Sequence, residues 1–204
     1  TTERDAYIAE FLGHARTLGF TLPIEAALHV HFDATRLKSA LVMRRLIQTL
    51  HGWGASLRAL VGTNPRCHRL GPWDDALVGV TYMPGFDELS WDEARARLAA
   101  QPITKFCDYN LSNLVLGVPN KDTFEVRIFP STLDEVEALK SIELFEALLL
   151  AIVQGDAPQV SPPRHQREYE VSLCALLDAL QRAGHLNDDA ARFWRARSSE
   201  LKVT

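Results

Sequence analysis

Apolar residues recur every three or four positions along several long segments, as they do on the buried face of an amphipathic helix. This spacing predicts a helix over 3–18, which Gly19 ends, and a second helix over 35–60. The Gly-Trp-Gly sequence at 52–54 weakens the second prediction, because glycine lowers helix stability. The longest apolar run predicts a buried helix over 136–152.

Capping signals mark where two helices begin. Ser90 and Glu93 form an S-x-x-E capping box, which predicts a short helix starting there. Thr132 and Glu135 form a second box, just before the longest helix. Gly155 follows the last apolar residues of that helix and is expected to end it.

The last quarter of the chain has its own organisation. A proline-rich connector at 155–165 is followed by a predicted helix over about 168–183 and a shorter one after Asn187. These two helices are expected to form a hairpin packed on the rest of the protein. We therefore expect one α+β domain over 1–155, with residues 156–204 adding a linker and C-terminal helices to the same domain.

Two segments alternate apolar and polar residues with a period of two, which is the pattern of a β-strand with one buried face. In the first segment the apolar residues are Leu28, Val30 and Phe32, and the polar ones are His29, His31 and Asp33. In the second the apolar residues are Phe124, Val126 and Ile128, and the polar ones are Glu125 and Arg127. Each strand is therefore expected to offer ionisable groups on one face.

Other segments give weaker β signals. The segment 105–116 predicts a strand joined by a turn to the strand at 122–129. Glycines and prolines over 62–86 predict a long loop with one short strand at 77–82, and loops of this length commonly carry function. The expected fold class is α+β, with a curved antiparallel sheet, helices on one face and a concave polar front.

Composition narrows the classes of function. Apolar residues make up 47% of the chain and charged residues 24%, and the longest apolar run is about half of the ~20 residues that a membrane span needs. The formal charge of −4 predicts no nucleic-acid partner and no membrane contact. Cys67, Cys107 and Cys174 lack metal or disulfide spacing, which is typical of a cytoplasmic protein.

The polar faces of the two strands carry chemically useful groups. Imidazole binds divalent metals, carboxylate binds hard cations, and guanidinium forks onto phosphate oxygens, so the two faces side by side could hold a metal–phosphate complex. An isolated H-x-H sequence, however, is more often part of a solvated sheet face or a core than a metal site. A metal-dependent hydrolase that uses H-x-H is a further alternative.

The order of several sequence blocks is informative beyond their individual chemistry. HVHFD followed by a helix, then NPRCHR, KFCDYNLSNL and FEVRIFPSTLD before a long apolar helix, resembles the amidoligase family over roughly 25–155. That family lies in the carboxylate-amine ligase superfamily with glutamine synthetase and glutamate-cysteine ligase. The resemblance implies a glutamine synthetase-like catalytic domain that uses ATP and Mg²⁺ to join a carboxylate to an amine through an acyl phosphate. The substrates of such an enzyme would be small molecules or peptides, and the enzyme could form a homo-oligomer.

The resemblance also implies roles for individual residues. His29 and Glu125 would be metal ligands, and His31 would contact a nucleotide phosphate. Arg127 would stabilise the transferred phosphoryl group. Glu125 would be a catalytic residue as well as a metal ligand. Further positions that the resemblance assigns to nucleotide or substrate are Arg66, Lys105 and Asn110.

One feature of the superfamily is missing from the sequence. Its ligases place an acidic E-x-E strand before the H-x-H strand, but Glu3 and Glu10 fall in a predicted helix and Glu25 stands alone. Either an N-terminal portion is absent from this sequence, or part of the metal cluster has been lost. In the second case the alternative to a ligase is a non-catalytic module that binds a nucleotide or a partner.

Overall fold

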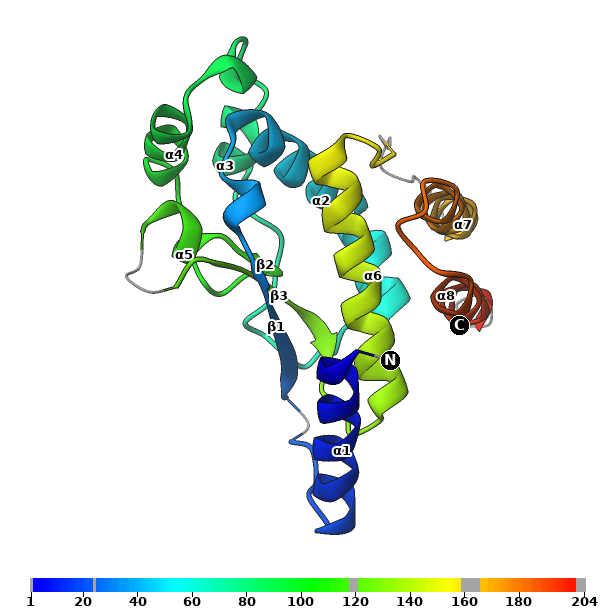
Figure 1. Cartoon of the computed structure of the whole chain (residues 1–204). Helices are drawn as coiled ribbons and strands as arrows, with labels where there is room; N and C mark the ends of the chain where they lie inside the picture. The colour runs from blue at the N-terminus through cyan, green and yellow to red at the C-terminus, as the bar shows by residue number, and fades with distance from the viewer. Residues whose placement is uncertain (1, 24, 118–120, 159–165, 201–204) are drawn as a thin grey trace.

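The computed structural model describes residues 2–23, 25–117, 121–158 and 166–200. In chain order these residues form α1 (Glu3–Thr17), β1 (Ala27–Asp33), η1 (Thr35–Leu37), α2 (Ala40–Val61), α3 (Asp75–Val80), η2 (Phe86–Glu88), α4 (Trp91–Ala99), β2 (Tyr109–Asn110), α5 (Ser112–Val115), β3 (Thr123–Pro130), α6 (Glu135–Gln154), α7 (Gln166–Arg182) and α8 (Asp188–Glu200). The predicted α+β class is confirmed (Figure 1). None of the described helices has an apolar stretch long enough to cross a membrane.

The sheet of the described residues has the strand order β1-β3-β2, and both strand pairs are antiparallel. As the central strand, β3 is buried along most of its length, whereas β1 keeps the alternating exposure that its sequence predicts. His31 lies opposite Glu125, and the register shifts between Leu28 and Val30. The extra residue is on β3, where Arg127 and Ile128 lie opposite His29 alone, and such a bulge redirects side chains.

The core lies between the sheet and helices α2 and α6, which cover one of its faces (Figure 1). Phe124 and Val126 of β3 point into this core and are fully buried. Phe145 of α6 contacts the rings of Tyr109 and Phe129, with centroids 6.0 and 5.1 Å apart. Helices α7 and α8 contact each other, α2 and α6 on the side away from the sheet.

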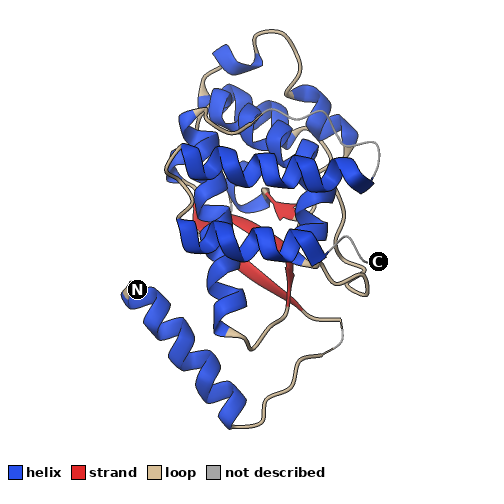
Figure 2. Ribbon diagram, turned by 90° about the vertical axis from the view of Figure 1, so that its right-hand side faces the viewer, coloured by secondary structure: helices blue, strands red, loops and turns tan. Residues whose placement is uncertain are grey.

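Helix α1 lies along α6 at one end of the molecule, apart from the sheet (Figure 2). Ion pairs join Arg4 to Glu146 and Arg16 to Glu135, and all four side chains are partly exposed. None of the α1 residues is buried. Exposed ion pairs contribute little to stability, so we infer that α1 is held more weakly than the elements around the core.

Helix α2 continues through the glycines at 52–54, although these weakened its prediction. Leu50, Trp53 and Leu57 are spaced three and four residues apart and are buried in the core. Burial of this face offsets the loss of helix stability at the glycines. The helix ends at Gly62, whose φ of 70° is the left-handed conformation that glycine adopts readily.

The short strand predicted at 77–82 is wrong, because this segment forms helix α3. The side chain of Asp74 accepts a hydrogen bond from the backbone N–H of Ala76 at 2.9 Å and so caps the helix. Leu77 and Val78 are then buried together in the core. Two adjacent apolar residues suit one face of a helix better than a strand that buries alternate residues.

The strand predicted over 105–116 is much shorter than expected, because within this segment it is Tyr109 and Asn110, the two residues of β2, that pair with β3. Asn110 ends this strand by accepting a hydrogen bond from the backbone N–H of Ser112 through its side-chain oxygen, at 2.8 Å. The chain then turns into α5. Asparagine commonly redirects a chain through such local hydrogen bonds.

The capping box predicted at 132–135 is also wrong, because Asp134 is the cap residue of α6. One oxygen of its side chain accepts hydrogen bonds from the backbone N–H groups of Val136 and Glu137 at 2.8 and 3.1 Å. A carboxylate at this position also interacts favourably with the helix dipole. The predicted end at Gly155 is confirmed by its φ of 87°.

Replacing Ser90 with alanine is expected to lower the free energy of unfolding by about 1 kcal/mol. Ser90 and Glu93 form the predicted capping box, with reciprocal hydrogen bonds of 3.3 and 3.0 Å, and the substitution removes one of them. Unfolding in urea measures the change. Ser39 begins α2 without a side-chain cap hydrogen bond, so Ser39→Ala is the matched control; equal losses in the two variants would contradict the prediction.

Candidate functional site

Polar side chains from all three strands meet on the face of the sheet opposite the α2–α6 core. They are His29 and His31 of β1, Asn110 of β2, and Glu125 and Arg127 of β3, and we refer to them as the His–Glu–Arg cluster. Strand alternation places both histidines on one face, and Glu125 is paired with His31 on one side and Asn110 on the other. The structure therefore brings together the ionisable groups of the two strands identified in the sequence.

The carboxylate of Glu125 is at the centre of the cluster. Its Oε1 accepts a hydrogen bond from Arg127 Nη1 at 3.0 Å and lies 3.1 Å from His29 Nδ1 and 3.7 Å from His31 Nε2. Its Oε2 accepts a hydrogen bond from Asn110 Nδ2 at 2.6 Å. The Glu125 and Arg127 side chains are only 7% and 11% exposed, against 36% and 47% for His29 and His31. A buried ion pair thus forms the floor of the site, and two imidazoles form its rim.

The sequence did not indicate how deeply the ion pair is buried, and this burial affects the pKa values of Glu125 and His29. Burial alone would raise the pKa of Glu125, but the hydrogen bond from Asn110 and the charges of Arg127 and the histidines outweigh it and hold this pKa below its usual value. Burial, and then the charge of Arg127, lowers the pKa of His29 despite the nearby carboxylate. At neutral pH the site therefore holds an ionised Glu125 and a neutral His29, the form in which imidazole binds metals.

The pKa of His29 is expected to move in opposite directions when its two charged neighbours are removed in turn. Arg127→Met removes a charge that lowers this pKa, so the pKa should rise; Glu125→Gln removes one that raises it, so the pKa should fall. NMR titration of the imidazole resonances of His29 measures both shifts. Glu88→Gln, on η2, is the control and should leave them unchanged, whereas shifts of the same sign would contradict this geometry.

Hydrogen bonds extend the cluster toward a basic hollow that was not predicted from the sequence. His31 Nδ1 lies 3.0 Å from Thr123 Oγ1, which also accepts a hydrogen bond from Asn113 Nδ2 at 3.2 Å. Asn113 lines a hollow of about 350 Å³, together with Lys38, Trp91, Arg95, Lys121 and Asp122. Three cations against one carboxylate favour an anionic ligand such as a polyphosphate. Separate parts of the chain supply them, so no local motif marks the hollow.

Two of the residues assigned by resemblance lie outside the cluster. Arg66 and Lys105 are exposed, and within the described residues neither side chain is hydrogen-bonded or ion-paired to the cluster. The Lys105 ammonium lies 5.3 Å from the centroid of the Phe106 ring. Asn110, by contrast, holds the carboxylate of Glu125. A role for Arg66 and Lys105 toward nucleotide or substrate stays a prediction.

The donor atoms of the cluster limit how a metal ion could bind. Within the described residues, no group of three or more His, Cys, Asp or Glu side chains is arranged to hold a metal ion. Arg127 Nη1 lies close to both Glu125 Oε1 and His29 Nδ1, at 3.0 and 3.4 Å, and competes for the same lone pairs. Mg²⁺, however, commonly uses one or two carboxylates and takes its other ligands from water and phosphate. The cluster fits that mode of binding.

Arg127 has an unused hydrogen-bond donor. Its Nε is buried and has no hydrogen-bond partner among the described residues. A buried donor without a partner is unfavourable by about 1–3 kcal/mol, and an anion bound at the cluster would remove this deficit. This donor and the basic hollow are independent indications of an anionic ligand.

The cysteine thiols take no part in the site. Burial raises the pKa of Cys107 to about 11, and its Sγ lies 3.1 Å from the carbonyl oxygens of Thr104 and Tyr109. A thiol with so high a pKa is a poor nucleophile. Cys67, Cys107 and Cys174 are all free.

The fold and the cluster define an α+β protein that presents a buried carboxylate–guanidinium pair beneath two imidazoles. A family model with the description "Putative amidoligase enzyme" matches residues 8–149, a range that includes all five cluster residues. The chain therefore belongs to the amidoligase family, as the order of its sequence blocks indicated. No curated protein and no solved structure is significantly similar to it.

Proposed function

We propose that this protein is an ATP- and Mg²⁺-dependent carboxylate–amine ligase that forms an amide or isopeptide bond through an acyl phosphate. Membership of the amidoligase family supports an amide-forming ligase. The observation that carries the proposal is the buried Glu125–Arg127 pair beneath His29 and His31, in the matched part of the chain. This arrangement offers metal ligands and a phosphate-binding group at one point.

The reaction needs activation, because a carboxylate and an amine do not condense spontaneously in water. A carboxylate oxygen of the substrate attacks the γ-phosphorus of ATP, and the bond to ADP breaks. The amine nitrogen then attacks the acyl carbon, phosphate leaves, and the nitrogen loses a proton. Both steps build negative charge on phosphoryl oxygens, so positioned cations are the main source of catalysis.

Each group of the cluster has a place in this reaction. The Arg127 guanidinium stabilises the charge on the transferred phosphoryl group. His31 contacts a phosphate oxygen from the exposed rim of the site. Asn110 fixes the carboxylate of Glu125 through the hydrogen bond of 2.6 Å. The protein thus supplies orientation and positive charge around the reacting phosphate.

Mg²⁺ would be held by Glu125 and His29 on the protein side, and it would offset the charge of the nucleotide phosphates. The remaining phosphates would lie in the neighbouring hollow, where Lys38, Arg95 and Lys121 are gathered. Trp91 in the same hollow offers a surface on which the base could stack. Hydrogen bonds through Thr123 join this hollow to the cluster.

On this proposal the three-stranded sheet corresponds to the catalytic sheet of a glutamine synthetase-like domain, and α7 and α8 form a helical hairpin added to it. The substrates are a carboxylate and an amine carried by small molecules or peptides, in the cytoplasm. Assembly of several copies would be compatible with a cluster built within one chain.

The proposal is tested with hydroxylamine as the amine and a panel of amino acids and short peptides as carboxylates. ATP- and Mg²⁺-dependent formation of a hydroxamate, with equimolar release of ADP, is the expected result. Glu125→Gln should abolish it, and the matched control Glu88→Gln, outside the cluster, should not. Turnover that is equal in the two variants would refute the site.

Two other results would favour the alternatives. Saturable binding of Mg-ATP in calorimetry, without turnover of any carboxylate, would indicate a non-catalytic nucleotide-binding module. Hydrolysis of amides with zinc and without ATP would indicate a hydrolase that uses the H-x-H strand. Each result would replace the ligase proposal.

A further inference from the structure

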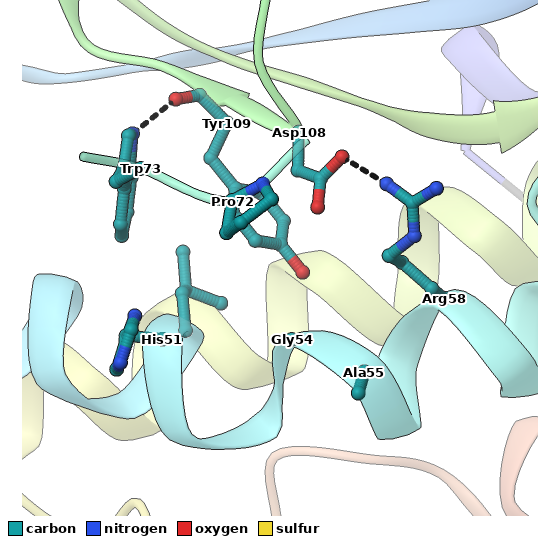
Figure 3. Close-up of a pocket in the computed structure, with 9 residues that line it drawn as sticks. His51, Gly54, Ala55, Arg58, Pro72, Trp73, Asp108 and Tyr109 are labelled. Atoms are coloured by element: carbon teal, nitrogen blue, oxygen red, sulfur yellow. Dashed lines mark hydrogen bonds and ion pairs between the residues drawn. The ribbon is translucent and has the colours of Figure 1, made fainter. Parts of the chain in front are cut away.

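A second hollow lies between β2 and helix α2 (Figure 3). Its volume is about 230 Å³. Its walls are mainly apolar and include Leu50, Gly54, Pro72, Trp73 and Tyr109. A dry cavity of ~150 Å³ is sufficient to bind benzene, so this hollow has room for one ring.

Tyr109 contributes a buried hydroxyl to the wall of this hollow. The residue is only 3% exposed, and its hydroxyl is buried without a hydrogen-bond partner among the described residues. In Figure 3 this hydroxyl points toward α2 at Gly54. Buried tyrosine hydroxyls usually have a partner, because leaving one unpaired is unfavourable. The position is therefore suited to a ligand that carries a hydrogen-bonding group.

Gly54 opens the floor of the hollow. It lies in the interior of α2, where glycine destabilises a helix relative to alanine. A Cβ atom built at this position would meet no atom within 4 Å, so packing of the protein does not explain the glycine. The missing side chain leaves the α2 side of the hollow open, where Gly54 and Tyr109 both line it.

The other side chains of the wall are held in place by hydrogen bonds and ring contacts, and their charges compensate each other. The indole N–H of Trp73 donates a hydrogen bond to the carbonyl oxygen of Tyr109 at 2.6 Å, and the two rings are 5.5 Å apart. Arg58 of α2 is paired with the buried Asp108, so these two charges compensate each other (Figure 3). Such a wall favours a neutral ligand. His51 and Pro72 are exposed, so the hollow opens to solvent at their side.

We propose that this hollow is a binding site for a neutral, ring-sized molecule with one hydrogen-bonding group, which stacks near Trp73 and bonds to the hydroxyl of Tyr109. The site is distinct from the ligase centre, since Tyr109 and its neighbour Asn110 point to opposite faces of the sheet. The proposal therefore does not depend on the ligase reaction.

Phenol and toluene are the probes, because they have nearly the same shape and differ in the hydroxyl group. NMR titration of the full chain should show saturable binding of phenol, in the millimolar range or tighter. Tyr109→Phe should weaken the binding of phenol on the order of fivefold, since one neutral hydrogen bond is lost, and should leave the binding of toluene unchanged. Gly54→Leu should abolish binding of both probes.

Gly13→Leu is the matched control, because Gly13 also lies within a helix with no atom within 4 Å of its Cβ position, but in α1. It should leave binding of both probes unchanged. Circular dichroism verifies that each variant is folded. If Gly54→Leu does not fold, Gly54→Ala replaces it and should weaken the binding of both probes several-fold. Absence of saturable phenol binding, or phenol binding that neither Tyr109→Phe nor substitution at Gly54 changes, would overturn the proposal.

Discussion

Replacing Arg127 with alanine is expected to reduce ATP-dependent amide formation by at least ~10³-fold. The same change should lower the free energy of unfolding by about 3–5 kcal/mol. Arg127 Nη1 donates to Glu125 Oε1 at 3.0 Å, and the Glu125 side chain is only 7% exposed. Without the guanidinium, a buried carboxylate would lose its main opposite charge. Activity would fall for a separate reason, since the group proposed to stabilise the phosphoryl charge is absent.

These two effects can be separated by removing both charges. The double variant Glu125→Gln and Arg127→Met leaves no unpaired charge in the floor of the site, so it should be more stable than Arg127→Ala. Its activity should stay as low as that of the single variant. Arg127→Lys keeps the charge but not the planar fork and should fall between the wild type and alanine.

Hydroxamate formation and unfolding in urea measure the two quantities for each variant. Full activity of Arg127→Ala would exclude Arg127 from the reaction. Recovery of both stability and activity in the double variant would show that the residue acts only as a partner for Glu125. Loss of activity that persists in the stable double variant shows that the reaction needs the charged groups themselves and not only the stability that their pairing provides.

Local periodicity was sufficient to predict the elements that build the site. The two-residue alternation around His29 and His31 and around Glu125 and Arg127 assigned each side chain to a face, and the structure has both strands with these faces. The long helix α6 and the two C-terminal helices were also predicted close to their observed bounds. Such elements are determined by neighbouring residues on the chain.

Features that depend on tertiary packing could not be predicted in this way. Glu125 and Arg127 were expected on the polar front of the sheet, and their burial could not be predicted because it results from the central position of β3. The cations of the basic hollow come from η1–α2, α4 and the segment before β3, and only the folded chain brings them together. Helix α3 was missed because the surrounding glycines and prolines indicate a loop, whereas the helix depends on its cap at Asp74 and on the burial of Leu77 in the folded chain.

Replacing Phe145 with alanine is expected to lower the free energy of unfolding by about 3–5 kcal/mol. Phe145 is fully buried in α6, and its ring contacts Tyr109 of β2 and Phe129 of β3. Its removal leaves a cavity between the helix and two strands, which such a packed core cannot fill by relaxation alone. Unfolding in urea gives the change from the shift in midpoint.

Val136→Ala is the control in the same helix, since Val136 is 49% exposed, and it should change the free energy of unfolding by less than about 0.5 kcal/mol. Phe145→Leu, which retains most of the apolar volume, should fall between the two. A loss below about 1 kcal/mol for Phe145→Ala would contradict the packing of α6 on the sheet. Because Tyr109 precedes Asn110, which holds Glu125, that packing also supports the position of the carboxylate at the centre of the cluster.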